Sequence, residues 1–188
     1  MLNEISGGVC AARGFQAAGV HCGVKASSSP DKNDLALILS ERECAAAAVY
    51  TLNRVKSAPV YVTMDHLEDG TAWGVVANSG NANACCPMSH EYAEEMARLA
   101  ARATGRAPAD FVVASTGVIG QTLNIAAIRA GMPAAECLVS EGSDVEIKRC
   151  GSAGLFVRCV AGRRLRSASF GVGSVGETSA RAIPTRYG

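Results

Sequence analysis

The residues best suited to chemistry lie in the Ser115-Thr116-Gly117 turn, which follows the apolar run from Phe111 to Ala114. A buried strand that ends in such a turn exposes backbone N–H groups at its carboxyl end, where open α/β sheets bind ligands. The glycine lets the backbone approach a substrate closely and adopt φ values closed to other residues. An amide and a hydroxyl presented in this way can stabilise an oxyanion, usually the largest contribution to acyl-transfer catalysis. The same residues would also suit an ordinary strand-to-helix connection.

A second polar segment, Asn78 to Ala84, contains three asparagines and follows the apolar run from Thr71 to Ala77. Its amide groups could fix polar ligands or neighbouring loops, or simply satisfy the backbone of an asparagine-rich turn. Arg54 and Lys56 could bind an anionic substrate group, although cations in front of a helix are usually just solvated. We assign no catalytic role to the histidines at 21 and 66, which lack an evident partner in the sequence, and we expect the histidine at 90 on the surface.

The cysteines do not form a metal site in the sequence pattern. There are eight, scattered and without a C-x-x-C pair, and the three histidines have no ligand spacing relative to them. In a chain without a secretion signal, reduced structural thiols are the better interpretation. We therefore predict no metal and no cofactor.

The patterns predict an α/β fold, a mixed sheet with flanking helices. Single strands are expected before Gly23, at Thr71–Ala77 in the centre of the sheet and at Phe111–Ala114. Asp34–Ser40 and Cys44–Thr51 are expected to form an antiparallel hairpin that turns at Glu41-Arg42-Glu43. The expected helices are Ser57 to about Leu67 with Pro59 in its first turn, Ser89–Thr104 with Ser89 as cap and Gly105 as stop, Asn124–Ala130 closed by Gly131 and Pro133, and a further short one over Ala134–Ser140.

Composition indicates a globular chain whose character changes near residue 144. The 188 residues are 48% hydrophobic and 19% charged, no apolar run approaches the length of a membrane span, and Met1 to Gly14 lacks the layout of a secretion signal. These features predict a cytoplasmic protein without membrane association. Residues 1–144 carry 10 Lys/Arg and 15 Asp/Glu, a net −5, whereas residues 145–188 carry 8 basic and 2 acidic residues, a net +6.

Five segments, in order and at the expected distances, carry a resemblance to a known family. They are Gly14–Val20, Asp34–Ile38, Thr51–Val60, Asn78–Ala84 and Ala114–Gly120. Together they resemble the amino-terminal part, or alpha chain, of the ornithine acetyltransferase (glutamate N-acetyltransferase) family of arginine biosynthesis. The resemblance covers about residues 8–144.

The resemblance implies a cytoplasmic acyltransferase that moves an acetyl group from N-acetylornithine to glutamate, with acetyl-CoA as a further possible substrate. Family members cleave themselves before a threonine, which becomes the nucleophile at the start of the carboxy-terminal (beta) chain. The Thr-Gly of the turn carries over to Thr116 and Gly117 as the oxyanion hole. The implied partners are the beta chain, further copies in an oligomer and the small-molecule substrates, and not nucleic acid.

The chain departs from the family pattern after Asp144. The expected Thr-Thr-Asp segment, lysine-bearing segment and Ala-Thr cleavage point do not appear among residues 145–188, so no nucleophile can be nominated. We predict a family-like domain over 1–144 and a divergent basic Gly/Ser/Arg-rich tail over 145–188, disordered or produced by a frame change. An alternative function is therefore a catalytically inactive remnant or ligand-binding module.

The tail also contains two weak motifs. Arg163-Arg164-Leu165-Arg166 could bind nucleic acid, although a solvated segment is the better interpretation. Gly171 to Gly176 has the spacing of a dinucleotide-binding loop, but no good strand is expected before it and no helix clearly follows.

Overall fold

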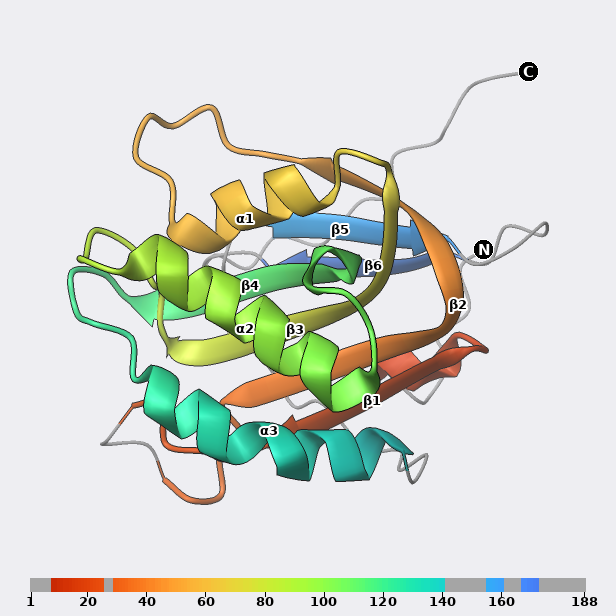
Figure 1. The fold of residues 1–188 in the computed structure, drawn as a ribbon, viewed down its shortest axis with the longest axis horizontal. Coiled ribbons are helices and arrows are strands. Elements are labelled where there is room, and N and C mark those ends of the chain that lie inside the picture. Colours follow the sequence, from red (N-terminus) through yellow and green to blue (C-terminus); the bar gives the residue numbers. More distant parts are fainter. Residues whose placement is uncertain (1–7, 26–28, 141–154, 161–166, 173–188) are drawn as a thin grey trace, which may run out of the picture.

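The described strands form one six-stranded mixed sheet, and the helices lie over one of its faces (Figure 1). The structure is a computed structural model, and it describes residues 8–25 and 29–140 and the strands at 155–160 and 167–172. The strands are β1 Phe15–Val20, β2 Leu35–Val49, β3 Thr71–Asn81, β4 Phe111–Val118, β5 Leu155–Val160 and β6 Ser167–Val172. The helices are α1 Ala58–His66, α2 Ser89–Thr104 and α3 Ile125–Ser140, with short 3-10 turns at Gly8–Ala11 and Pro108–Asp110. The expected α/β class is confirmed.

One pair of strands runs parallel. The sheet order is β4-β3-β2-β5-β6, and β1 pairs with β2 as well. The chain leaves β3, forms α2 and returns in β4, so these two strands pair in parallel and end at the same edge. The other pairings of the described strands are antiparallel.

The predicted hairpin at Glu41-Arg42-Glu43 is wrong, because β2 is one continuous strand of 15 residues. The three charged residues are exposed and sit where the register with β3 shifts between Leu39 and Cys44. A bulge of this kind lets a long strand bend without reversing its direction. The first part of β2 therefore pairs with β1, and its last five residues pair with β5.

The helices bury a continuous apolar cluster against the sheet. Leu35 and Leu37 of β2 face the helices, whereas Ile38 belongs to a second cluster on the opposite face, as expected for alternating side chains. The first cluster combines strand residues with one or more residues of each helix, among them Val62, Val76, Met96, Val113 and Ile128. None of the described helices has the length and hydropathy that a membrane span requires.

Two helix boundaries differ from the prediction. Ser89 does not cap α2, because Met88 occupies the cap position with φ 62° and the Ser89 hydroxyl donates to the Cys86 carbonyl. Gly105 does end α2, with φ 68°. The α1 helix follows Ser57 as expected, but without a hydrogen bond from its side chain.

The predicted break at Gly131 and Pro133 is also wrong, because α3 is one helix of 16 residues. Gly131 serves packing, since a Cβ there would lie 2.5 Å from the Cβ of Cys22. Pro133 removes one helical N–H donor, yet the helix continues past it because neighbouring residues on both sides are buried: Met132 is 2% and Ala135 0% exposed. Tertiary packing overrides the local stop signal.

The tail contains two strands that the sequence reading missed. β5 and β6 extend the sheet beyond β2, and β6 leads into the glycine-rich stretch, so the expectation that no good strand precedes it is wrong. Gly171 itself pairs with Phe156 of β5. The arginine run at 163–166 and residues 173–176 lie outside the described residues. The division at residue 144 and the origin of the tail stay predictions.

Candidate functional site

The two polar segments singled out in the sequence lie side by side at the carboxyl ends of β3 and β4. In this parallel pair Asn78 is opposite Ser115, Ser79 is opposite Thr116, and the glycines that follow face each other. Segments 37 residues apart in the chain thus form one corner of the sheet. This is the edge at which parallel strands place ligands.

The asparagines of β3 use their side chains on protein partners. Asn78 is fully buried, its Oδ1 accepts a hydrogen bond of 2.6 Å from the Ser115 hydroxyl, and its Nδ2 donates to the Asn81 carbonyl at 3.0 Å. Asn81 Nδ2 donates to the carbonyls of Gln121 and Thr122. These contacts support two of the interpretations left open: Asn78 satisfies the backbone of its own segment, and Asn81 fixes the neighbouring loop. The network holds the segment after β4 against the end of β3.

Asn83 completes this network with a strained backbone. Its φ is 49°, its Nδ2 donates to the Ser89 carbonyl at 2.8 Å, and its N–H donates to Asn81 Oδ1. Its side-chain oxygen is buried and has no hydrogen-bond partner among the described residues. An outside donor would be needed to satisfy this oxygen.

Thr116 and Gly117 stand at the end of β4 with different exposures. Thr116 is 7% exposed, whereas Gly117 is exposed and has φ 135°, a value that favours glycine. A Cβ on Gly117 would lie 2.3 Å from the carbonyl carbon of Gly80 and 2.5 Å from the nitrogen of Asn81. The positive φ and the close approach to the backbone of β3 both require glycine here, and the approach to a substrate stays a prediction.

The described cavities lie elsewhere. One of about 470 Å³ runs between α2 and α3, and one of about 330 Å³ lies where α1 and α2 begin. Neither is lined by Thr116 or Gly117. The role of these two residues as an oxyanion hole stays a prediction.

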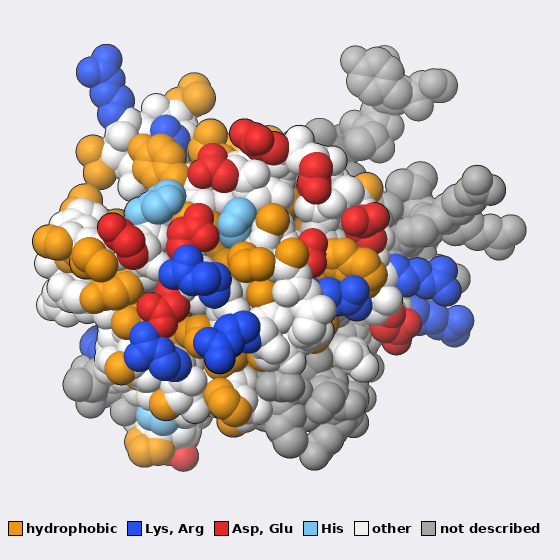
Figure 2. All heavy atoms as spheres, in the orientation of Figure 1, with side chains coloured by type: hydrophobic (Ala, Val, Ile, Leu, Met, Phe, Trp, Pro, Cys, Tyr) orange, Lys and Arg blue, Asp and Glu red, His pale blue; other side chains and the backbone are white. Residues whose placement is uncertain are grey.

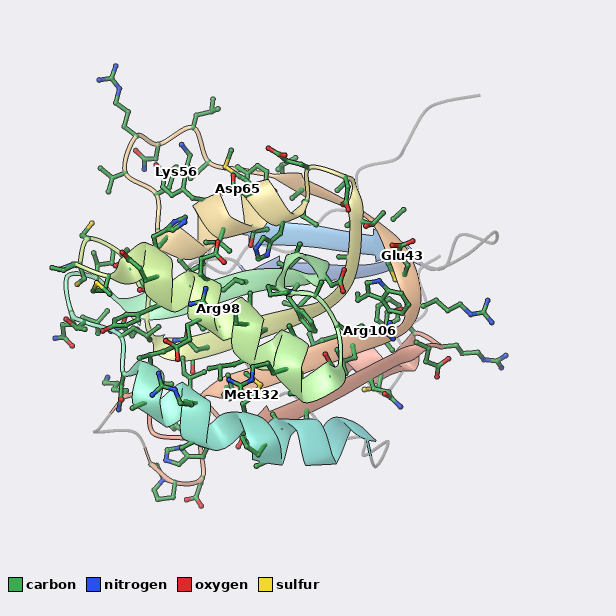
Figure 3. All side chains as sticks on the ribbon, in the orientation of Figure 1. Glu43, Lys56, Asp65, Arg98, Arg106 and Met132 are labelled. Atoms are coloured by element: carbon green, nitrogen blue, oxygen red, sulfur yellow. The ribbon has the colours of Figure 1, made fainter. Side chains whose placement is uncertain are left out.

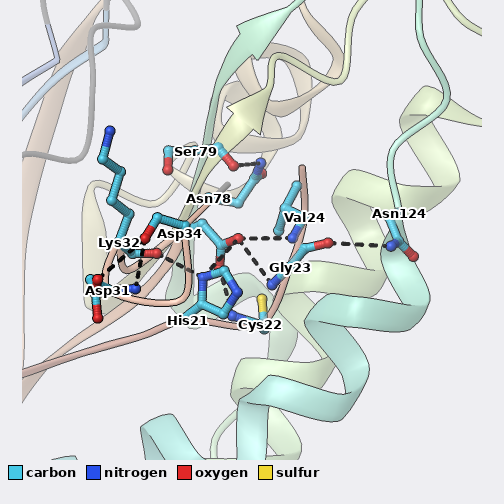
Figure 4. A network of polar contacts seen from close by, with 11 residues as sticks. His21, Cys22, Gly23, Val24, Asp31, Lys32, Asp34, Asn78, Ser79 and Asn124 are labelled. Carbon is cyan, nitrogen blue, oxygen red and sulfur yellow. Dashed lines mark hydrogen bonds and ion pairs between the residues drawn. The ribbon is translucent and has the colours of Figure 1, made fainter. Parts of the chain in front are cut away.

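The buried carboxylate of Asp34, which is not among the candidates predicted from the sequence, lies close to this corner (Figure 4). Asp34 is 4% exposed and accepts backbone N–H bonds from Cys22 at 2.7 Å, Gly23 at 3.0 Å and Val24 at 2.8 Å. Its backbone carbonyl accepts from the N–H of Ser79 in β3. Asp34 thus ties the turn after β1 to the candidate site.

Cys22 and His21 lie next to this carboxylate. Burial first, and the nearby Asp34 second, raise the pKa of the Cys22 thiol from 9.0 to about 12. The thiol therefore stays protonated and unreactive at neutral pH. His21 Nδ1 lies 2.8 Å from the Lys32 carbonyl and 3.8 Å from Asp34 Oδ2. These contacts assign His21 a structural role.

Side chains of helix α1 form hydrogen bonds with the backbone groups on the outer edge of β4. The Thr63 hydroxyl donates to the Val113 carbonyl at 2.9 Å and accepts from the Val113 N–H at 3.0 Å. His66 Nδ1 donates to the Phe111 carbonyl at 2.8 Å. β4 is the last strand on its side, so without these side chains its backbone groups would be open to other pairing. Nothing in the sequence pattern signals either contact.

The two basic candidates, Arg54 and Lys56, lie outside the corner formed by β3 and β4. Arg54 is exposed, and Lys56 Nζ lies 5.5 Å from the centre of the Tyr61 ring. Within the part of the chain that is described, no group of three or more His, Cys, Asp or Glu side chains could hold a metal ion. The candidate site therefore consists of the corner formed by β3 and β4.

Comparisons with known proteins identify the family of the chain. The model of the ArgJ family matches residues 16–153. The "Arginine biosynthesis bifunctional protein ArgJ" of Symbiobacterium thermophilum is 48% identical over 140 residues, covering 74% of this chain and 35% of that protein. The protein of the same name from Gloeobacter violaceus is 43% identical over 164 residues, covering 86% of this chain and 40% of that protein. The chain thus spans little more than a third of the length of these relatives.

Two solved structures share the fold over almost their whole chains. Ornithine acetyltransferase of Mycobacterium tuberculosis, solved as a complex with ornithine, has a TM-score of 0.70 and 29% identity, covering 93% of this chain and 96% of that chain. The arginine biosynthesis bifunctional protein of Bacillus halodurans has a TM-score of 0.69 and 27% identity, covering 93% and 94%. The resemblance drawn from the five segments is confirmed: the chain belongs to the ArgJ family.

Proposed function

We propose that this chain forms the amino-terminal part of an acyltransferase that moves an acetyl group from N-acetylornithine to glutamate in arginine biosynthesis. Its relatives are named as arginine biosynthesis proteins, and one structural neighbour was solved with ornithine bound. Acetyl-CoA is a possible second acetyl donor, and the reaction needs no cofactor or metal. The partners are the carboxy-terminal chain of the same family and further copies in an oligomer.

The observation that carries the proposal is the corner at the ends of β3 and β4. Gly117 is exposed there with a positive φ, next to the threonine whose hydroxyl would share the developing negative charge. The Asn78–Ser115 bond and the Asp34 turn fix this corner before any substrate arrives. Donors that are fixed in advance cost no reorganisation during the reaction.

The nucleophile would come from another chain, because none can be nominated in these 188 residues. No Ala-Thr dipeptide occurs after residue 144, so the acetyl-enzyme would form on a threonine of the carboxy-terminal chain. We therefore expect the isolated 188-residue chain to show no acetyl transfer.

Complementation tests the proposal. The purified chain is mixed with a separately produced carboxy-terminal chain of an ArgJ relative, and transfer of acetyl from N-acetylornithine to glutamate is followed. Turnover by the mixture and by neither chain alone supports the proposal. Turnover by the 188-residue chain alone would refute the assigned division of roles.

The missing threonine favours a second candidate, a ligand-binding module without catalysis. Calorimetry with N-acetylornithine, alone and after addition of the carboxy-terminal chain, separates the two. Binding that persists without any turnover in the mixture supports the module, and restored turnover rejects it.

A further inference from the structure

A groove between α2 and α3 carries an excess of positive charge that the candidate site does not use. The cavity of about 470 Å³ is lined by Arg98, Arg102 and Arg129, by one carboxylate, and by apolar residues (the full lining is Glu95, Arg98, Leu99, Arg102, Ala103, Arg129, Met132 and Pro133). Figure 2 shows basic side chains gathered over these helices near the middle of the visible face. The volume lies within the range of small-molecule sites.

The carboxylate is already engaged. Both Nε and Nη2 of Arg129 donate to Glu95 Oε1, so this pair crosses the groove from α3 to α2. Three arginines and one glutamate leave a net charge of +2 on the walls. An anion is therefore the ligand class that these walls attract.

The guanidinium groups of the other two arginines, Arg98 and Arg102, are not engaged in close ion pairs with the described residues. Arg98 Nη1 lies 3.9 Å from Glu94 Oε2, and its Nη2 donates to the Glu91 carbonyl at 3.5 Å, both at the long limit for such contacts. Among the described residues, no carboxylate lies within ion-pair distance of Arg102. The two stand four residues apart on one face of α2, so their guanidinium groups can act on adjacent acidic groups of one ligand. Guanidinium forks suit phosphate oxygens in particular.

The floor of the groove is apolar. Leu99 and Ala103 of α2 and Met132 and Pro133 of α3 are its apolar lining residues, and Met132 is only 2% exposed. Figure 3 shows Arg98 on α2, and Met132 of α3 in the space between the two helices. A free phosphate would fill only the charged part, whereas a ligand that joins a pyrophosphate to a flat, weakly polar ring would use both parts.

We propose that the α2–α3 groove binds a nucleotide carrying a pyrophosphate. The phosphates lie against Arg98 and Arg102, and the base packs on Leu99 and Ala103, the partly exposed apolar residues of α2 that line the groove. This site is separate from the corner at β3 and β4, since neither Thr116 nor Gly117 lines it. The proposal therefore does not depend on the proposed acetyl transfer. The nucleotide could be free or part of a larger molecule such as coenzyme A, which has the same chemistry.

Titration calorimetry on the full 188-residue chain tests the proposal with ADP, coenzyme A, inorganic phosphate and an acidic peptide. We expect ADP or coenzyme A to bind more tightly than phosphate, and Arg102→Gln or Arg98→Gln to weaken that binding about tenfold or more. Arg42→Gln is the matched control, because it removes the same charge from an exposed residue of β2 that does not line the groove, and it should leave the affinity unchanged. Tighter binding of coenzyme A than ADP identifies the larger molecule as the source, and equal binding identifies the free nucleotide.

A gain in affinity gives a second, independent readout. Glu95→Gln removes the charge that neutralises Arg129, so ADP should bind severalfold more tightly and with a steeper dependence on salt. The proposal is overturned if neither nucleotide binds in the millimolar range, or if Arg42→Gln weakens binding as much as Arg102→Gln. It is also overturned if the acidic peptide binds more tightly than both nucleotides, since the groove would then be a protein-binding surface.

Discussion

Replacing the buried Asp34 carboxylate should destabilise the fold at the candidate site. In Asp34→Ala the three N–H groups of Cys22, Gly23 and Val24 lose their acceptor together. The turn they form is also linked to α3, because Asn124 Nδ2 donates to the Gly23 carbonyl. The substitution therefore loosens a connection between the start of β2, the end of β3 and the start of α3.

The expected loss of stability in Asp34→Ala depends on how exposed each of the three N–H donors is. A hydrogen bond to a charged acceptor contributes about 1.5–3 kcal/mol, and a buried donor left unpaired costs about 1–3 kcal/mol. The Val24 bond is buried, whereas the Cys22 and Gly23 bonds are only partly buried, so water can replace part of what these two lose. We expect Asp34→Ala to lower the free energy of unfolding by about 3–5 kcal/mol. Asp34→Asn keeps one acceptor oxygen and should lose less.

Urea unfolding followed by circular dichroism measures this difference. Asp31→Ala is the matched control, because Asp31 is exposed in the same connection and should change stability by less than about 0.5 kcal/mol. The denaturant slope should stay constant, so that the midpoint shift reports stability. A loss in Asp34→Ala within 1 kcal/mol of the Asp31→Ala value would contradict the reasoning, because three charge-assisted bonds cannot be worth so little.

The remaining predictions concern packing and thiol chemistry. Gly117→Ala places a Cβ 2.3 Å from a backbone carbon of β3 at a positive φ, so it should lower the free energy of unfolding by about 2–4 kcal/mol in a urea titration. Gly120→Ala meets open space and should lower it by only about 1 kcal/mol. Equal losses in the two variants would contradict the close contact between Gly117 and β3. Gly131→Ala should cost about 1–3 kcal/mol because its Cβ would lie 2.5 Å from that of Cys22, and an unchanged midpoint would contradict the packing of α3. Because burial raises the pKa of the Cys22 thiol to about 12, iodoacetamide at about pH 8 should modify the exposed Cys85 well before Cys22, as read by peptide mass spectrometry; similar rates would refute the protected thiol.

The sequence located the candidate corner because its signals are local. A β-branched run that ends in Ser-Thr-Gly and an apolar run that ends in Asn-Ser-Gly both mark strands by their own composition. With α2 between them, the parallel pairing follows from the βαβ connection. The stop of α2 at Gly105 was predictable for the same reason, since glycine at this position needs no distant partner.

The errors occurred where distant packing overrides a local signal. Gly131 and Pro133 resemble a helix end, but the glycine is there to let α3 approach Cys22. The charged residues at 41–43 resemble a turn, yet they form the bulge of a strand that is held on both edges by partners elsewhere in the chain. Asp34 was missed because its three donors lie 10 to 12 residues away and form no motif.

The most direct measurement of the central claim is the kcat of the complemented enzyme carrying Thr116→Val. Thr71→Val is the control, because Thr71 lies at the opposite end of β3, away from the corner. If Thr116 stabilises the oxyanion, its loss should lower kcat about 10²–10³-fold with little change in KM, and the control should match the unaltered protein. A Thr116→Val enzyme with the kcat of the control would contradict the assignment of this corner to acyl transfer.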